Sequence, residues 1–328
     1  MKRMTFLLCM LAINVAAHGQ LKIVTTTTDY ADLARQVGGD RADVHSVMRG
    51  PEDVHNVLAK PTEMVKLNRA DLFVHGGLDA EPWRDNLLRG GRNPRVNPGR
   101  PGNVDMSAGI ELKDVPAGRV DRSMGDVHAY GNTHYSLSPA NAQRMTATLA
   151  KAMAQADPAN ADAYKRNAAR LVNELADVSR EIRARFAPWA GLKVVTFHHG
   201  AWDYFSDAVP IRIVGEIEPK PSITPSPEQL RQLVARMKEE QVKVVICGTY
   251  NDDRLARHVA EQAGATLVVL PEHVLGVAEA NSYQSLFRHN VEKLIEAAKS
   301  AGVQPVDNNA PAPAAAAAAT TAGHRHAH

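Results

Sequence analysis

Short runs rich in β-branched residues alternate with helical patterns along most of the chain, and this alternation limits the fold more than any other feature. The runs form two sets separated by a long helical stretch: residues 22–28, 44–48 and 71–75, then residues 193–197, 211–216, 243–247 and 266–270. Strands that alternate with helices pair in parallel, because a parallel pair needs a crossover connection. We therefore expect an α/β fold with two parallel-sheet lobes.

The stretch between the two sets predicts long helices that link the lobes. Ser138-Pro139 supplies an N-cap residue and a proline at the first helical position, and Asp157-Pro158 interrupts the pattern. From 159 to 187 the apolar residues recur every three or four positions, as expected for a helix with one buried face. Such a helix is about 40 Å long at 1.5 Å per residue, so it can join the two lobes as a rigid strut.

The two ends of the chain differ in composition from the rest. Lys2 and Arg3 precede an apolar run, which predicts a signal peptide over residues 1–19. This run is shorter than the roughly 20 residues that span a bilayer, so we expect a cleaved leader. Residues 305–328 are rich in Ala and Pro and end in histidines, and we expect a disordered tail there. Its histidines could collect metal or be a biased terminus.

Between these ends we expect three parts: a first lobe over residues 20–137, the linking helices over 138–190 and a second lobe over 191–304. The formal net charge of +2 gives no excess that would favour nucleic acid or an anionic membrane. Removal of the leader leaves Cys247 as the one thiol, which rules out an intramolecular disulfide.

Several of the 14 histidines lie where parallel α/β sheets collect ligands, just after predicted strands or just before predicted helices. His55 follows a turn that contains Gly, Pro and Asp, and His134 directly precedes the linking helices. His198 and His199 end a predicted strand. Because successive strand side chains point to opposite faces, we expect one of this pair to enter a cleft.

Together these segments resemble the zinc and manganese solute-binding proteins of bacterial ABC importers, the family that includes the periplasmic zinc-uptake proteins. The resemblance covers residues 21–301. His55 matches the family histidine that precedes a proline, although the family's Glu-Pro is Lys60-Pro61 here. Residues 134–142 match the segment His-x-x-Leu-x-Pro-x-Asn-Ala. The third family histidine lies five residues before a Tyr-Phe pair, which selects His199.

The resemblance implies a fourth ligand, a carboxylate from the last strand-to-helix loop of the second lobe. Glu272 is the expected residue. The family's usual aspartate is not in clear register, so His273 and Glu279 are alternatives. His128 lies six residues before His134 in a glycine-flanked loop, where it is either a further metal ligand or an exposed loop histidine.

By this resemblance the chain is a periplasmic, monomeric binding protein that captures Zn²⁺ between its lobes and delivers it to an inner-membrane ABC permease. A periplasmic metallochaperone is a further expected partner. Three neutral imidazoles and one carboxylate suit zinc, whereas manganese prefers more oxygen ligands. A manganese receptor of the same family is the alternative.

Two other classes of function are alternatives to the metal receptor. A zinc-dependent hydrolase could use three histidines and a water, but the sequence has no His-Glu-x-x-His helix and no evident general base. A receptor for a metal chelate or a corrinoid needs aromatic walls or arginine clusters, and only 5% of the residues are aromatic. We therefore expect a binding protein and not an enzyme.

Overall fold

The computed structural model describes residues 19–118, 128–220 and 223–306. The expected signal peptide, apart from Gly19, and the expected tail from residue 307 onward lie outside the described residues. Among the helices in these ranges, none is both long enough and apolar enough to cross a membrane.

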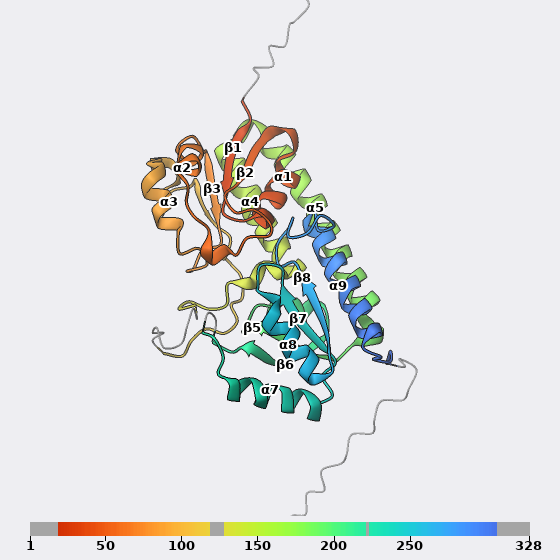
Figure 1. The fold of residues 1–328 in the computed structure, drawn as a ribbon. Coiled ribbons are helices and arrows are strands. Elements are labelled where there is room, and N and C mark those ends of the chain that lie inside the picture. The colour runs from red at the N-terminus through yellow and green to blue at the C-terminus, as the bar shows by residue number, and fades with distance from the viewer. Residues whose placement is uncertain (1–18, 119–127, 221–222, 307–328) are drawn as a thin grey trace, which may run out of the picture.

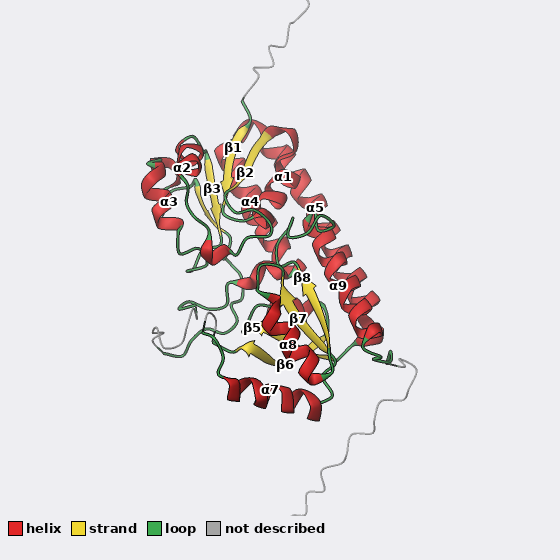
Figure 2. Ribbon diagram, viewed as in Figure 1, coloured by secondary structure: helices red, strands yellow, loops and turns green. Residues whose placement is uncertain are grey.

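Two four-stranded parallel sheets form the frame of the protein (Figure 2). The first has the order β2-β1-β3-β4, and the second has the order β6-β5-β7-β8. The prediction of two parallel-sheet lobes is confirmed, although β4, only three residues long, had no sequence signal. The strands are β1 Leu21–Thr25, β2 Ala42–Ser46, β3 Leu72–His75, β4 Asn103–Asp105, β5 Leu192–His198, β6 Ile211–Glu218, β7 Val244–Gly248 and β8 Thr266–Leu270.

Helices cover both faces of each sheet, because side chains alternate between the faces along each buried strand. In the first lobe, α2 and α3 pack on one face and α1 and α4 on the other. In the second lobe, α7 and α8 pack on one face and α5, α6 and α9 on the other. The helices are α1 Thr28–Gly38, α2 Pro61–Asn68, α3 Arg84–Gly91, α4 Pro139–Ala156, α5 Ala161–Phe186, α6 Asp203–Ala208, α7 Pro227–Glu239, α8 Asp253–Ala263 and α9 Tyr283–Ser300.

The linking helices begin and end close to the predicted positions. The Ser138 side chain accepts a hydrogen bond from Asn141 N and caps α4. The chain then bends at Asp157-Pro158 and continues as α5, 26 residues long. Figure 1 shows α5 running beside both lobes, with α9 next to it in the second lobe. The predicted apolar face of α5 is buried, at Leu171, Leu175, Val178, Ile182 and Phe186.

The largest hydrophobic cluster is continuous across both lobes. It joins Ile23 and Leu33 of the first lobe, through α5, to Val194 and Phe287 of the second. Burial of apolar surface stabilises each lobe by roughly 25 cal/mol per Å², and here the two lobes share the same buried surface. The lobes should therefore unfold together.

Leu175 on α5 tests this shared core, since its side chain is 0% exposed. Leu175→Ala should lower the free energy of unfolding by about 2–5 kcal/mol, through lost burial and a residual cavity. Urea unfolding followed by circular dichroism should keep a single transition. Asn173→Ala, on the exposed face of α5, is the control and should change stability by no more than about 0.5 kcal/mol. Two separate transitions would contradict a shared core.

Candidate metal centre

Three histidines of the first lobe lie around one point in the cleft between the lobes. The ring centroids of His55 and His128 are 5.2 Å apart, those of His55 and His134 are 6.4 Å apart, and those of His128 and His134 are 6.3 Å apart. Imidazoles that share a tetrahedral zinc have centroids about 5 Å apart, given Zn–N bonds of about 2.0 Å. Within the described ranges no three His, Cys, Asp or Glu side chains already meet at metal-binding distances.

Local hydrogen bonds fix the main chain at two of these histidines. His55 lies in the short 3₁₀ helix Val54–Asn56, whose N-cap residue Asp53 accepts a hydrogen bond from His55 N at 2.9 Å. His134 begins the 3₁₀ helix His134–Leu137, and Asn132 Oδ1 accepts a hydrogen bond from its main-chain N at 2.9 Å. The ring Nδ1 of His134 lies 3.0 Å from the same oxygen. Since an amide oxygen only accepts, Nδ1 carries the proton and Nε2 has a free lone pair.

His128 is held by a carboxylate from a distant part of the chain. Its Nδ1 lies 2.9 Å from Asp79 Oδ1, and Ala129 N donates to Asp79 Oδ2 at 2.8 Å. Burial acts to raise the pKa of Asp79, but these two hydrogen bonds hold it below its usual value. The hydroxyl of Thr133 lies 2.8 Å from His128 Nε2. A carboxylate on one imidazole nitrogen is the arrangement that orients metal-binding histidines.

His134 is kept neutral by its surroundings. Burial is the largest cause of a pKa well below the usual value, followed by the nearby charges of His128, His55, His273 and His198. A neutral imidazole can bind a metal without first losing a proton. These neighbours also place two second-lobe histidines within electrostatic reach of His134.

The histidine pair at the end of β5 lines the cleft, but its two members have different surroundings. His198 is 20% exposed, with Nε2 at 2.6 Å from Asn251 Oδ1 and Nδ1 at 3.2 Å from Glu218 Oε2. His199 is 44% exposed, and its Nδ1 lies 3.6 Å from Glu216 Oε1. This contact with the Glu216 carboxylate is the largest cause of a raised pKa at His199. Both residues line the cavity, and strand alternation does not extend to His199, because β5 ends at His198.

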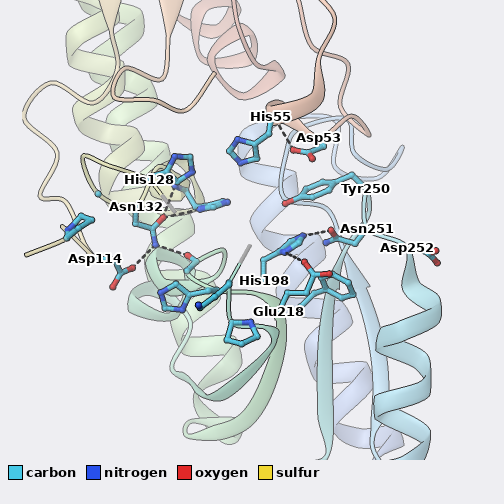
Figure 3. A pocket seen from close by; sticks show the side chains of 18 residues that line it. Asp53, His55, Asp114, His128, Asn132, His198, Glu218, Tyr250, Asn251 and Asp252 are labelled. Atoms are coloured by element: carbon cyan, nitrogen blue, oxygen red, sulfur yellow. Dashed lines mark hydrogen bonds and ion pairs between the residues drawn. The ribbon is translucent and has the colours of Figure 1, made fainter. Parts of the chain in front are cut away.

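The cleft cavity has a volume of about 610 Å³, and residues of both lobes line it. Figure 3 shows His55 and His128 on the first-lobe side and His198 on the second-lobe side, next to Asn251 and Glu218. A second, much smaller cavity of about 30 Å³ lies behind His134, which lines both. His134 therefore lies between the two cavities.

Glu272 and His273 line this smaller cavity together with His134. Glu272 is 2% exposed, and its Oε2 accepts a hydrogen bond from the Tyr250 hydroxyl at 3.0 Å. Burial raises the pKa of Glu272 to about 7. His273 Nδ1 lies 2.6 Å from Asp29 Oδ2 of the first lobe. Glu279, the other alternative, is exposed, and its charge acts to raise the pKa of the partly buried His289, which burial lowers.

Buried polar atoms without hydrogen-bond partners concentrate at the two cavities. In the described part of the chain there are seven such side-chain atoms, on Thr27, Glu81, Trp189, His198, Asn251, Glu272 and Asn290. Five of these residues line the cleft or the cavity behind His134. Each such atom lowers the stability of the folded protein by about 1–3 kcal/mol. A group of them at one place is therefore typical of a site where a ligand supplies the missing partners.

Sequence reasoning did not identify the residues that support these histidines. Asp79 contacts the ring of His128 from 49 residues away in the sequence, and Asp29 contacts the ring of His273 from 244 residues away. Asn132 was missed as well, although its position two residues before His134 is a signal, because Asn commonly accepts a main-chain hydrogen bond two residues on.

The model of the family described as "Zinc-uptake complex component A periplasmic" matches residues 23–297. The chain belongs to this family. It is 26% identical to the metal ABC transporter substrate-binding lipoprotein ScbA of Streptococcus cristatus, over 84% of this chain and 88% of that protein. It is also 26% identical to the manganese ABC transporter substrate-binding lipoprotein PsaA of Streptococcus mitis, over 86% of this chain and 90% of that protein.

Among solved structures, a ZnuA deletion mutant with zinc bound has the same fold, with a TM-score of 0.71 and 24% identity over 88% of this chain and 99% of that one. Family membership makes the chain an extracytoplasmic, divalent-metal-binding solute-binding protein of an ABC importer. It is a transport protein and not an enzyme, which removes the hydrolase alternative.

The carboxyl of Asp203, at the start of α6, faces Asp114 of the first lobe. Burial is the largest cause of a pKa raised to about 6, and the hydrogen bond and the charge of Asp114 add to it. The folded protein therefore holds a proton that the unfolded chain releases. This contribution to stability is fully present below pH about 4 and is lost as pH rises through about 6.

Asp203→Asn should therefore stabilise the protein at pH 7.5, by about 1–2 kcal/mol once partial solvent exposure is allowed for. At pH 4 the same substitution should change the free energy of unfolding little. Urea unfolding of both proteins with a chelator present measures the difference. An equal effect of the substitution at the two pH values would contradict the conclusion that the raised pKa of Asp203 lets the folded protein hold an extra proton.

Proposed function

We propose that this protein captures Zn²⁺ in the cleft between its lobes and delivers it to an inner-membrane ABC permease. The observation that carries the proposal is the triangle of three first-lobe imidazoles, with ring centroids no more than 6.4 Å apart. His198 of the second lobe lines the same cavity as these three residues. We further propose that the protein acts as a periplasmic monomer and that a periplasmic metallochaperone is a second partner.

His55, His128 and His134 are the ligands that we propose from the first lobe. The Nδ1–H of His134 and the carboxylate beside His128 leave Nε2 of each ring as the metal-binding atom. For His128 this requires only that the hydroxyl of Thr133 give up its contact with Nε2. Rotation of the three rings that moves each Nε2 by roughly an ångström then brings the three nitrogens to one cation.

The second lobe offers His198, His199 and Glu272. The geometry favours His198, because it lines the cleft cavity and its buried Nδ1 has no aligned hydrogen bond. The family spacing favours His199, which is half-exposed and paired with Glu216. Glu272 shares the smaller cavity with His134, and its Oε1 has no hydrogen-bond partner. Glu272 is therefore the alternative ligand if the lobes approach each other.

The ligand set supports zinc over manganese. Imidazole nitrogen suits zinc, while manganese favours carboxylate, carbonyl and water oxygen. The Streptococcus mitis relative is named for manganese and the ZnuA structure contains zinc, so the proposal rests on the histidines of this chain. Copper and nickel should bind at least as tightly in vitro, which makes a direct comparison of zinc with manganese the informative one.

Titration of the chelator-treated protein tests this function. Wild type should bind about one equivalent of zinc well below micromolar Kd, and manganese at least about tenfold more weakly. His134→Ala should weaken zinc binding by about 100-fold or more, because a central ligand is lost. Less than about half an equivalent of zinc, or a Kd no tighter than micromolar, would end the proposal.

Adjacent substitutions identify the second-lobe histidine. His198→Ala should weaken zinc binding by at least about tenfold, whereas His199→Ala should change it by less than about threefold. The two variants are matched, since they remove the same group at the same strand end. The reverse ranking would assign the ligand to His199, and two weak effects would move the second-lobe ligand to Glu272, where Glu272→Gln is then decisive.

A further inference from the structure

The side chain of Asn132 uses all of its hydrogen-bonding capacity between the two lobes. It is 5% exposed. Its Oδ1 accepts from His134 N at 2.9 Å and lies 3.0 Å from His134 Nδ1. Its Nδ2 donates to Gly200 O of the second lobe at 2.8 Å and to Asp114 Oδ2 at 3.0 Å. A carboxamide has two donor hydrogens and two acceptor lone pairs, and all four are in use.

The main chain of Asn132 is held from both sides as well. Its N donates to Lys113 O at 2.8 Å, and its O accepts from the Tyr204 hydroxyl of α6 at 3.2 Å. The same hydroxyl accepts from Lys113 N at 2.8 Å. Loops of the first lobe and the start of α6 in the second lobe are thus joined at one residue.

Gly200 is shaped for this contact. It has a φ of +76°, and a Cβ added there would lie 2.9 Å from Asn132 Nδ2. Only glycine adopts this conformation without strain while also allowing so close an approach. Gly200 directly follows His198 and His199, so the Asn132 amide connects the ligand-bearing loop of one lobe to that of the other.

We propose that Asn132 is a positioning residue that fixes the tautomer of His134 and holds it in register with the His198-His199-Gly200 loop of the second lobe. This inference rests on the proposed metal site. The Oδ1 selects the Nδ1–H form of His134, which presents Nε2 to the metal. The Nδ2 makes the position of that ring depend on the second lobe, so the ligands of the two lobes are set together.

Only a carboxamide of this length fulfils both roles. An aspartate still accepts from His134, but it cannot donate to Gly200 O and would place a second negative charge against Asp114. An alanine removes both contacts. The two substitutions therefore separate control of the tautomer from coupling between the lobes.

The test uses the full mature chain, with zinc as the probe. Nitrogen-15 NMR of the metal-free protein reports which ring nitrogen of His134 carries the proton, and stopped-flow transfer of zinc to a chelator reports its dissociation rate. Asn132→Ala should shift His134 toward the Nε2–H form and weaken zinc binding by about 10–100-fold. Asn132→Asp should keep the Nδ1–H form but release zinc at least about tenfold faster than wild type.

Asn93→Ala is the matched control. Asn93 is 3% exposed, and its amide donates to Leu67 O and Ala70 O in the first lobe, among hydrophobic residues that do not line the cleft. Its loss should lower stability but leave the His134 tautomer and the zinc kinetics unchanged. Asn132 variants with wild-type tautomer and wild-type zinc release would overturn the inference. A wild type that binds no zinc would instead defeat the proposed function, while the tautomer measurement still tests Asn132.

Discussion

The packing of α5 against both lobes is the constraint on which the rest of this structure depends. Its buried face belongs to a hydrophobic cluster that extends from the strands of the first sheet to those of the second. Opening the cleft widely would expose this cluster to water, at roughly 25 cal/mol per Å² of apolar surface. Relative motion of the lobes is therefore confined to modest rocking and to the loops at the cleft.

Contacts across the cleft strengthen this constraint. Thr28 Oγ1 donates to Val274 O at 2.6 Å, and Asp29 accepts from Val274 N at 2.8 Å. Gly50 approaches the main chain of Leu275 so closely that a Cβ there would lie 2.1 Å from a carbonyl carbon. Such contacts keep histidines of the two lobes near one another, and the shared core offsets the cost of the unpaired polar atoms beside them.

The fold could be predicted from the sequence because it depends on repeated local patterns. The apolar spacing gave a helix over 159–187, against Ala161–Phe186 in the structure, and Ser138 caps α4 as expected. The site depends on pairs of residues that are distant in the chain. The sequence placed His128 in a glycine-flanked loop and left its role open, because nothing local indicates its partner Asp79.

The histidine pair shows a different limit. The spacing from Tyr204-Phe205 selects a histidine by its sequence position alone. The alternation of side chains holds only within a regular strand. His199 is the first residue after β5 ends at His198, so strand alternation does not determine the direction of its side chain. The choice between His198 and His199 therefore stays a prediction, as does the role of Glu272, which the sequence alone could equally have placed on the surface and which is in fact 2% exposed.

The proposed ligand set also explains how a receptor can bind a metal tightly without large rearrangement. His134 is already neutral and oriented by Asn132, and His128 is oriented by Asp79. Groups that are ordered before binding lose little conformational entropy when the ligand arrives. At His128 the contact that must be exchanged is that of the Thr133 hydroxyl with Nε2. In the proposed set, release of the cation reverses the same small step.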